Sequence, residues 1–206
     1  EGETLRIHRD LDLLRYSGGK LHIPIVTSAS GISAIREAKK EGLDVTCGTS
    51  VHHLRWTDTD LDGFNRALRL HHPLRSEADR KALREAAIDG TLDVVVSDHR
   101  PRTPEEHDVD FLVVAPGIAG LHAVGPVLFG ALIDHGTTEA DALNAMSRLL
   151  SAGPRHILDA GDGVSFFAPD GSLSPSPSKA PNTVYTADTE GVRGAVVGAV
   201  SPPGAH

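Results

Sequence analysis

The chain has 206 residues, which fits one large domain or a domain and a half. Its formal net charge of -8 disfavours a nucleic-acid backbone or an anionic membrane surface as partner. Cys47 is the only cysteine, so no internal disulfide forms, and no apolar run approaches the roughly 20 residues of a membrane span. We therefore expect a cytoplasmic protein with no nucleic-acid and no membrane partner.

An alternation of strand and helix signals begins at residues 21–26, an apolar run that predicts a strand. Ser30 is the expected N-cap of a helix that stops at Gly42, and residues 43–47 predict the next strand. Ser76 then caps a helix that ends at Gly90. The buried face of that helix is expected to consist of Leu83, Ala86 and Ala87.

Residues 92–97 predict a third strand, which ends at Asp98. Residues 118–135 predict a long apolar helix with a kink at Pro126, and Thr138 is the expected N-cap of a helix that runs to Leu150. Strands and helices that alternate in this order predict an α/β fold with a parallel sheet or part of a barrel.

The character of the sequence changes after about residue 158. Residues 164–168 and 192–200 predict two strands of a smaller sheet, separated by a loop rich in Pro and Ser. We therefore place a partial barrel at residues 1–157 and a segment of a small β domain, with the C-terminal tail, at residues 158–206. Since three barrel strands leave two unpaired edges, we expect chain outside this sequence to complete the sheet.

Asp98 is the leading candidate for a functional residue. It follows the apolar β-branched run Val94 to Val96, and side chains at the carboxyl ends of strands line the active site of an α/β barrel. An aspartate there suits an acid, a base or a metal ligand, whereas a cap or loop-ordering aspartate is the structural alternative. Nucleophilic catalysis has no separate support, because the sequence has no Gly-x-Ser-x-Gly elbow.

Three stretches of this sequence are similar to motifs of one known family. Lys20-Leu-His-Ile-Pro-Ile-Val-Thr-Ser-Ala resembles a strand ending in His-Val-Ser-Thr, and Val45-Thr-Cys-Gly-Thr-Ser-Val-His-His-Leu resembles Val-Thr-Ala-Glu-Val-Thr-Pro-His-His-Leu. Asp89-Gly-Thr-Leu-Asp-Val-Val-Val-Ser-Asp-His-Arg-Pro-Arg resembles Asp-Gly-Thr-Ile-Asp followed by Thr-Asp-His-Ala-Pro-His. Secondary matches are His72-Pro-Leu-Arg, Ala115-Pro-Gly-Ile-Ala-Gly-Leu and Ser178-Lys-Ala-Pro-Asn-Thr. The family is the dihydroorotases of the amidohydrolase superfamily.

The resemblance implies the C-terminal part of a (β/α)8 TIM-type barrel plus part of a small β domain. It also implies a metal-dependent cyclic amidase that interconverts N-carbamoyl-aspartate and dihydroorotate in pyrimidine biosynthesis, with zinc as the expected metal. Asp98 falls on the position that binds metal and shuttles the proton. The positions matched to substrate contacts, or beside them, are His71, Arg102, Pro116 and Gly117.

The sequence departs from the family pattern at the metal site. The metal-binding histidine of His-Val-Ser-Thr falls on Ile25, which has no lone pair to offer. His71 stands where the family has an asparagine, and Arg102 stands where it has the last histidine of Asp-His-Ala-Pro-His. The phenylalanine of the Ala-Pro-Phe-Gly loop is missing between Pro116 and Gly117. Because a catalytic zinc needs about three protein ligands, we expect an incomplete metal site.

Two adjacent histidine pairs, His52-His53 and His71-His72, are the other ligand candidates. In an extended segment neighbouring side chains point to opposite faces, so each pair offers at most one inward ligand. We expect these histidines to serve packing or loop order instead. His99 is expected to bond to the backbone, and Trp56 is expected in the core.

Three functional interpretations stay open. The first is a dihydroorotase-like domain without its metal that acts as a scaffold, since inactive relatives of that kind associate with aspartate transcarbamoylase. The second is a zinc dihydroorotase completed by ligands outside this sequence. The third is another cyclic amidase, suggested by His71 and Arg102. In all three we expect a homo-oligomer, and in the active forms a small-molecule substrate, dihydroorotate or carbamoyl-aspartate.

Overall fold

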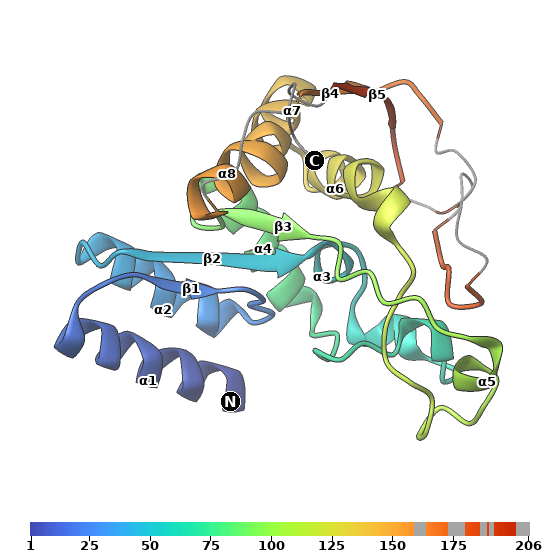
Figure 1. Ribbon diagram of the computed structural model, residues 1–206, viewed down its shortest axis with the longest axis horizontal. Helices are drawn as coiled ribbons and strands as arrows, with labels where there is room; N and C mark the ends of the chain where they lie inside the picture. Colours follow the sequence, from blue (N-terminus) through green and yellow to red (C-terminus); the bar gives the residue numbers. More distant parts are fainter. Residues whose placement is uncertain (159–163, 173–179, 186–188, 190–191, 201–206) are drawn as a thin grey trace.

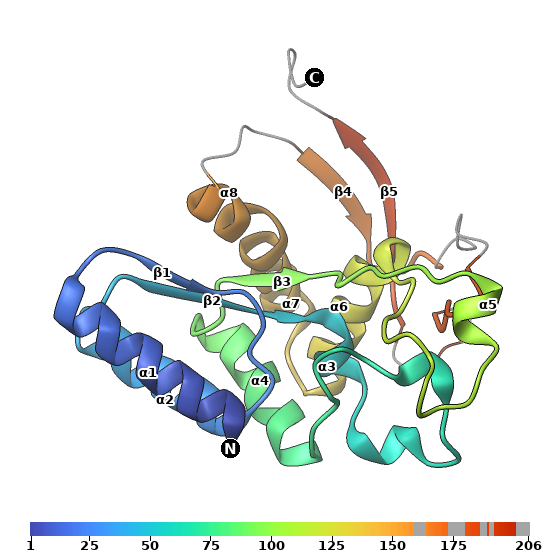
Figure 2. The same cartoon turned by 60° about the horizontal axis from the view of Figure 1, so that its bottom comes forward.

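The computed structural model describes residues 1–158, 164–172, 180–185, 189 and 192–200. Its main sheet has three parallel strands in the order β1 (Leu21–Ile23), β2 (Val45–Ser50) and β3 (Val94–Val96). Helices α1 (Gly2–Ser17), α2 (Ala29–Lys40) and α4 (Glu77–Asp89) lie on the same face of this sheet (Figure 2). The expected α/β class with a parallel sheet is confirmed.

The remaining elements connect and flank this sheet (Figure 1). Helix α3 (Val51–Arg55) follows β2 directly, and the loop after β3 contains α5 (Pro104–His107). Helices α6 (Val124–Asp134), α7 (Glu139–Ser147) and α8 (Gly153–Leu158) come next in the chain. A separate antiparallel pair is formed by β4 (Val164–Ala168) and β5 (Ala195–Val200). Short 3-10 helices lie at Asp58–Leu61, Arg66–Leu68 and Leu121–Ala123, and a π-helical turn lies at Arg148–Ala152.

Helix α4 is the element that the sequence predicts best. Ser76 caps it by accepting a hydrogen bond from the Asp79 backbone N–H, and Gly90 ends it in the left-handed conformation at φ 87°. Its buried positions include Leu83, Ala86 and Ala87, as expected from their spacing.

Helix α2 begins two residues earlier than predicted, so the expected cap at Ser30 is wrong. Ser28 has the extended backbone of an N-cap, and its Oγ accepts a hydrogen bond from Gly31 N at 3.1 Å. The carboxylate of Glu3, from α1, accepts hydrogen bonds from the backbone N–H groups of Thr27 and Ser28, both at 3.0 Å. Helix α1 therefore fixes the start of α2.

Three further helices differ from the sequence prediction. Helix α1 was not predicted, because its buried side chains, Ile7, Leu11 and Leu14, are interspersed with exposed apolar ones such as Leu5. Helix α6 begins at Val124 and not at residue 118. The predicted kink at Pro126 is absent because this proline lies in the first turn of α6, where its missing N–H has no helical partner to lose. Helix α7 likewise ends at Ser147, before the wide turn Arg148–Ala152.

The hydrophobic core lies between the sheet and its covering helices. Ile35, Ala38, Leu92 and Leu132 are fully buried, and Cys47 of β2 is buried with them. Burial raises the pKa of the Cys47 thiol to about 12, so this side chain is a packing residue and not a nucleophile. The small sheet packs onto the core through Phe167, whose ring meets Phe129 of α6 edge-on at 5.3 Å between centroids.

No described helix is both long enough and apolar enough to span a membrane. The division of the chain at residues 157 and 158 stays a prediction.

Candidate functional site

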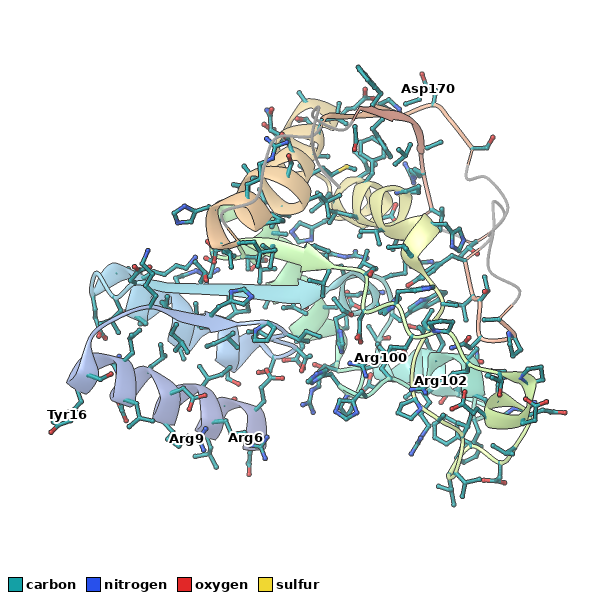
Figure 3. All side chains as sticks on the ribbon, viewed as in Figure 1. Arg6, Arg9, Tyr16, Arg100, Arg102 and Asp170 are labelled. Atoms are coloured by element: carbon teal, nitrogen blue, oxygen red, sulfur yellow. The ribbon has the colours of Figure 1, made fainter. Side chains whose placement is uncertain are left out.

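The carboxyl ends of the three parallel strands point to one edge of the sheet, where the loops after β1 and β3 and helix α3 lie (Figure 1). In an α/β barrel this edge carries the chemistry. Figure 3 shows Arg100 and Arg102 beyond the strand ends, away from α1. This strand-end site contains Asp98, as the sequence predicts.

Asp98 combines burial with an unusual backbone conformation. Its φ of 40° lies in the left-handed region, which a residue other than glycine occupies at an energetic cost. Its side chain is 6% exposed, and Oδ1 accepts a hydrogen bond from Arg100 Nε at 2.8 Å. Oδ2 is buried and has no hydrogen-bond partner in the described part of the chain. Because few buried polar atoms in folded proteins lack a partner, Asp98 is a candidate functional residue.

Hydrogen bonds hold the loop that carries Asp98 against the facing segment, residues 117–121, and against Asn182. Arg100 N donates to Ile118 O at 2.9 Å, and the amide of Asn182 donates to Arg100 O at 2.8 Å and to Gly117 O at 2.9 Å. His99 Nδ1 accepts a hydrogen bond from Leu121 N at 3.3 Å, so the expected backbone role of His99 is confirmed.

The other predicted site residues are only partly brought together. Arg102 donates through Nε to Pro116 O at 3.1 Å and pairs with Glu106, so its guanidinium already has protein partners. Gly117 lies in the same facing segment. His71 is exposed, and its ring meets the edge of His72 at 5.2 Å between centroids. Substrate contact by these four residues stays a prediction. A surface hollow lined by Phe64, Arg66 and residues 108–112 includes none of them.

The pair His52 and His53 does not lie in an extended segment, so that expectation is wrong. Both residues belong to helix α3 and both are buried. His53 Nε2 lies 3.0 Å from the carbonyl oxygen of His72, which can only accept, so Nε2 carries the hydrogen. Nδ1 then accepts from the Ser50 hydroxyl at 2.9 Å. Burial lowers the pKa of His53 to about 4, so it is a neutral structural residue near pH 7.

His52 is held by two aromatic residues. Trp56 Nε1 can only donate, and it donates to the Tyr185 hydroxyl at 3.1 Å. The Tyr185 hydrogen is therefore directed to His52 Nδ1 at 2.8 Å, and the rings of His52 and Tyr185 stack with 5.7 Å between centroids. This chain of hydrogen bonds leaves the hydrogen of His52 on Nε2. Burial lowers the pKa of His52 to about 3, so the ring is neutral.

The sequence did not single out Arg100, Asn182 or Tyr185. Asn182 and Tyr185 come from the C-terminal part of the chain, and the stretch Ser178-Lys-Ala-Pro-Asn-Thr was the only signal near them. Trp56 is partly buried against the core, as expected, but it also belongs to this hydrogen-bond chain. These residues determine how the site is charged and hydrogen-bonded.

The described residues do not complete a zinc site. No three His, Cys, Asp or Glu side chains in the described ranges gather closely enough to hold a metal ion. Asp98 Oδ2 and His52 Nε2 are buried without partners, which leaves room for at most a partial donor set. Ile25, just beyond β1, supplies no donor.

Curated relatives of this chain are dihydroorotases. The chain is 38% identical over 159 residues to "Dihydroorotase" of Anaeromyxobacter dehalogenans (strain 2CP-1 / ATCC BAA-258), which covers 76% of this chain and 36% of the relative. It is 37% identical over 164 residues to "Dihydroorotase" of Thermus aquaticus, with 77% and 38% covered. The chain therefore spans little more than a third of the length of the curated relatives it matches. No protein-family model matches it.

Solved structures share the fold at lower sequence identity. "L-Hydantoinase (Dihydropyrimidinase) from Arthrobacter aurescens" superposes with a TM-score of 0.78 at 21% identity, covering 94% of this chain and 46% of that chain. A dihydroorotase from Saccharomyces cerevisiae in complex with 5-fluoroorotic acid gives 0.69 at 17% identity, covering 92% and 55%. The expected fold class, part of a (β/α)8-type barrel with part of a small β domain, is confirmed.

Proposed function

Because this chain belongs with the dihydroorotases of the amidohydrolase superfamily, we propose that it is a dihydroorotase-like domain whose strand-end site does not hold a catalytic metal. The observation that carries this proposal is the ion pair that Asp98 already forms within the protein. Asp98 Oδ1 is paired with Arg100, and Ile25 stands where the resemblance places a metal-binding histidine. The proposed role is that of a scaffold in pyrimidine biosynthesis.

Zinc, when bound in this family, polarises a carbonyl and supplies hydroxide. The described residues of this chain do not fit that task, because Asp98 is paired with a guanidinium and Ile25 supplies no donor. Instead, Asp98 orders the loop after β3 by holding Arg100.

The partners and location belong to the same proposal. We infer a cytoplasmic homo-oligomer that associates with aspartate transcarbamoylase, because inactive members of the resembled family act in that way. The substrate of an active form would be dihydroorotate or carbamoyl-aspartate. The division into a partial barrel at residues 1–157 and a small β segment at 158–206 is part of this proposal.

A second candidate function is an active zinc dihydroorotase whose remaining ligands come from chain outside this sequence. Two of the buried atoms that have no hydrogen-bond partner in the described residues, Asp98 Oδ2 and His52 Nε2, favour it, because both lie at the strand ends where such a site would form. Against it stand the Arg100 ion pair and Ile25, which offers no donor.

A dihydroorotate hydrolysis assay on the full-length protein, with added zinc, separates the two candidates. The scaffold proposal predicts no turnover by the protein alone. Activity of the protein alone would contradict it, and activity that appears only with aspartate transcarbamoylase would indicate a site completed by the partner. The Ile25→His variant, assayed in parallel, tests whether the missing ligand is the only defect.

A further inference from the structure

Arg100 is the cation of the strand-end site. Its Nε lies 2.8 Å from Asp98 Oδ1, and no other cation of the described chain lies within ion-pair distance of that carboxylate. The Asp98 side chain is 6% exposed, whereas that of Arg100 is 42% exposed. A carboxylate so deeply buried needs a positive partner, and a guanidinium is always charged in proteins.

The position of Arg100 is fixed by its surroundings. Ile118 O and the Asn182 amide bind the two ends of its backbone, at 2.9 and 2.8 Å. The aliphatic part of its side chain lies against Gly117, where a Cβ would come within 2.4 Å of Arg100 Cβ. Only glycine therefore allows Arg100 to lie there, and Gly117 also has a φ of 139° that other residues rarely adopt.

The sequence comparison points to the same residue. In the family motif Asp-His-Ala-Pro-His, the residue two places after the aspartate is an uncharged alanine, and here it is Arg100. The family's phenylalanine is missing just before Gly117, the residue that packs against Arg100. Arg100 and the shortened loop are therefore in contact through Gly117.

We propose that Arg100 takes the electrostatic place of a divalent metal at Asp98 and thereby excludes zinc from the strand-end site. This inference rests on the proposed function and adds the residue responsible. A zinc ion that approached Asp98 would have to displace the guanidinium from Oδ1 and would meet its positive charge at close range. The built-in cation makes the pair Asp98–Arg100 stable without a metal.

Zinc affinity of full-length variants tests this inference. Arg100→Gln removes the charge but keeps an amide donor for Asp98 Oδ1, and Arg100→Met is a second neutral variant of similar length. Arg100→Lys keeps the charge. Arg36→Gln is the matched control, because Arg36 forms an ion pair of similar length with Asp89 on the protein surface. Each variant is made in the parent protein and in the Ile25→His background, and melting temperature without zinc verifies folding.

We expect Arg100→Gln and Arg100→Met to bind zinc at least about tenfold more tightly than their own background, measured by competition with a chromophoric chelator. Arg100→Lys and Arg36→Gln should match their backgrounds. Equal zinc affinity of the neutral variants and their backgrounds would overturn the inference and leave the proposed function standing. A gain by Arg100→Lys as large as that of Arg100→Gln would also overturn it, because charge would not be the cause. Stoichiometric zinc in the parent protein would instead overturn the proposed function.

Discussion

Strand β3 is flanked by two aspartates with opposite surroundings. Asp93, before the strand, has an Oδ2 that accepts hydrogen bonds from Lys39 Nζ and from Cys47 N, each at 2.7 Å. Asp98, after the strand, has a left-handed backbone, one oxygen paired with Arg100 and one buried oxygen without a partner in the described residues. Asp93 therefore stabilises the start of the strand through its hydrogen bonds. Asp98, at the end of the strand, has a strained backbone, and only one of its two carboxylate oxygens is hydrogen-bonded in the described residues.

This difference shows how the sheet divides its tasks. The amino ends of the strands are tied to α2 through Asp93 and Lys39, and polar atoms there have partners from neighbouring elements. The carboxyl ends keep unpartnered buried atoms on Asp98 and His52. The polar groups of the amino end are tied into the fold, whereas the carboxyl end holds the candidate site, which is the division expected of an α/β barrel.

Among the substitutions, loss of Asp93 should cost the most stability. Asp93→Ala leaves the Cys47 N–H and the Lys39 ammonium without their charged acceptor, so we expect a loss of about 2–3 kcal/mol in the free energy of unfolding. Denaturant unfolding of the full-length protein measures it. Asp44→Ala is the control, because Asp44 forms only a long, exposed pair with Lys20 at 3.7 Å. Equal losses for Asp93→Ala and Asp44→Ala would contradict the stabilising role that we assign to Asp93.

Tyr185→Phe tests whether the hydrogen bonds from Trp56 through Tyr185 to His52 stabilise the carboxyl end of the sheet. Without the hydroxyl, His52 Nδ1 and Trp56 Nε1 lose their partner inside the protein, so unfolding should become easier by about 1–2 kcal/mol. The ring itself stays, so packing is preserved. A neutral effect in denaturant unfolding would contradict the hydrogen-bond chain through which we assign the His52 tautomer.

Acid should act on the carboxyl end through its buried histidines. Burial holds the pKa of His53 at about 4 and that of His52 at about 3, below the ordinary value of 6.5. Below pH 6.5 the unfolded chain binds protons that the folded chain does not, so stability is complete above pH 6.5 and is lost as the pH falls toward these values. The slope is about 1.4 kcal/mol per pH unit for each histidine.

Thermal unfolding between pH 7 and pH 5 measures this loss. His53→Gln, which can still bond to Ser50 and to the His72 carbonyl, should make the curve flatter. His8→Gln, on the exposed surface of α1, should leave it unchanged. A parent protein as stable at pH 5 as at pH 7 would show that these histidines are not buried in the neutral form.

Asp98→Asn should have the smallest effect on stability. Asparagine tolerates the left-handed backbone, and the ion pair that it removes involves a half-exposed arginine, so we expect a change within about 0.5–1 kcal/mol. Denaturant unfolding beside Asp93→Ala gives the direct contrast. A loss as large as that of Asp93→Ala would mean that Asp98 is a stability residue like its counterpart.

Local signals explain which parts of the fold the sequence predicts. Helix α4 is recognisable because its cap, its buried face and its terminal glycine lie within one short stretch. Helix α1 escapes prediction because exposed Leu5, Leu13 and Tyr16 obscure its buried face. The Pro126 prediction fails because a proline signals a kink only in the interior of a helix, and the sequence does not fix where α6 begins.

The site is predictable only in part for a related reason. Asp98 is marked by the strand that precedes it, so sequence alone places it correctly. The partner of His52, Tyr185, is 133 residues away in the chain, and Asn182 reaches Arg100 across 82 residues. Contacts over such separations depend on tertiary packing and leave no periodic signal.

The zinc content of the full-length protein, purified and dialysed against metal-free buffer, tests the central claim most directly. The claim is that Arg100 and Ile25 leave the strand-end site unable to hold a catalytic metal. We predict far less than one zinc ion per chain by elemental mass spectrometry, with no increase after incubation with zinc chloride and a second dialysis. Retention of one zinc ion per chain that is lost in Asp98→Asn would contradict it.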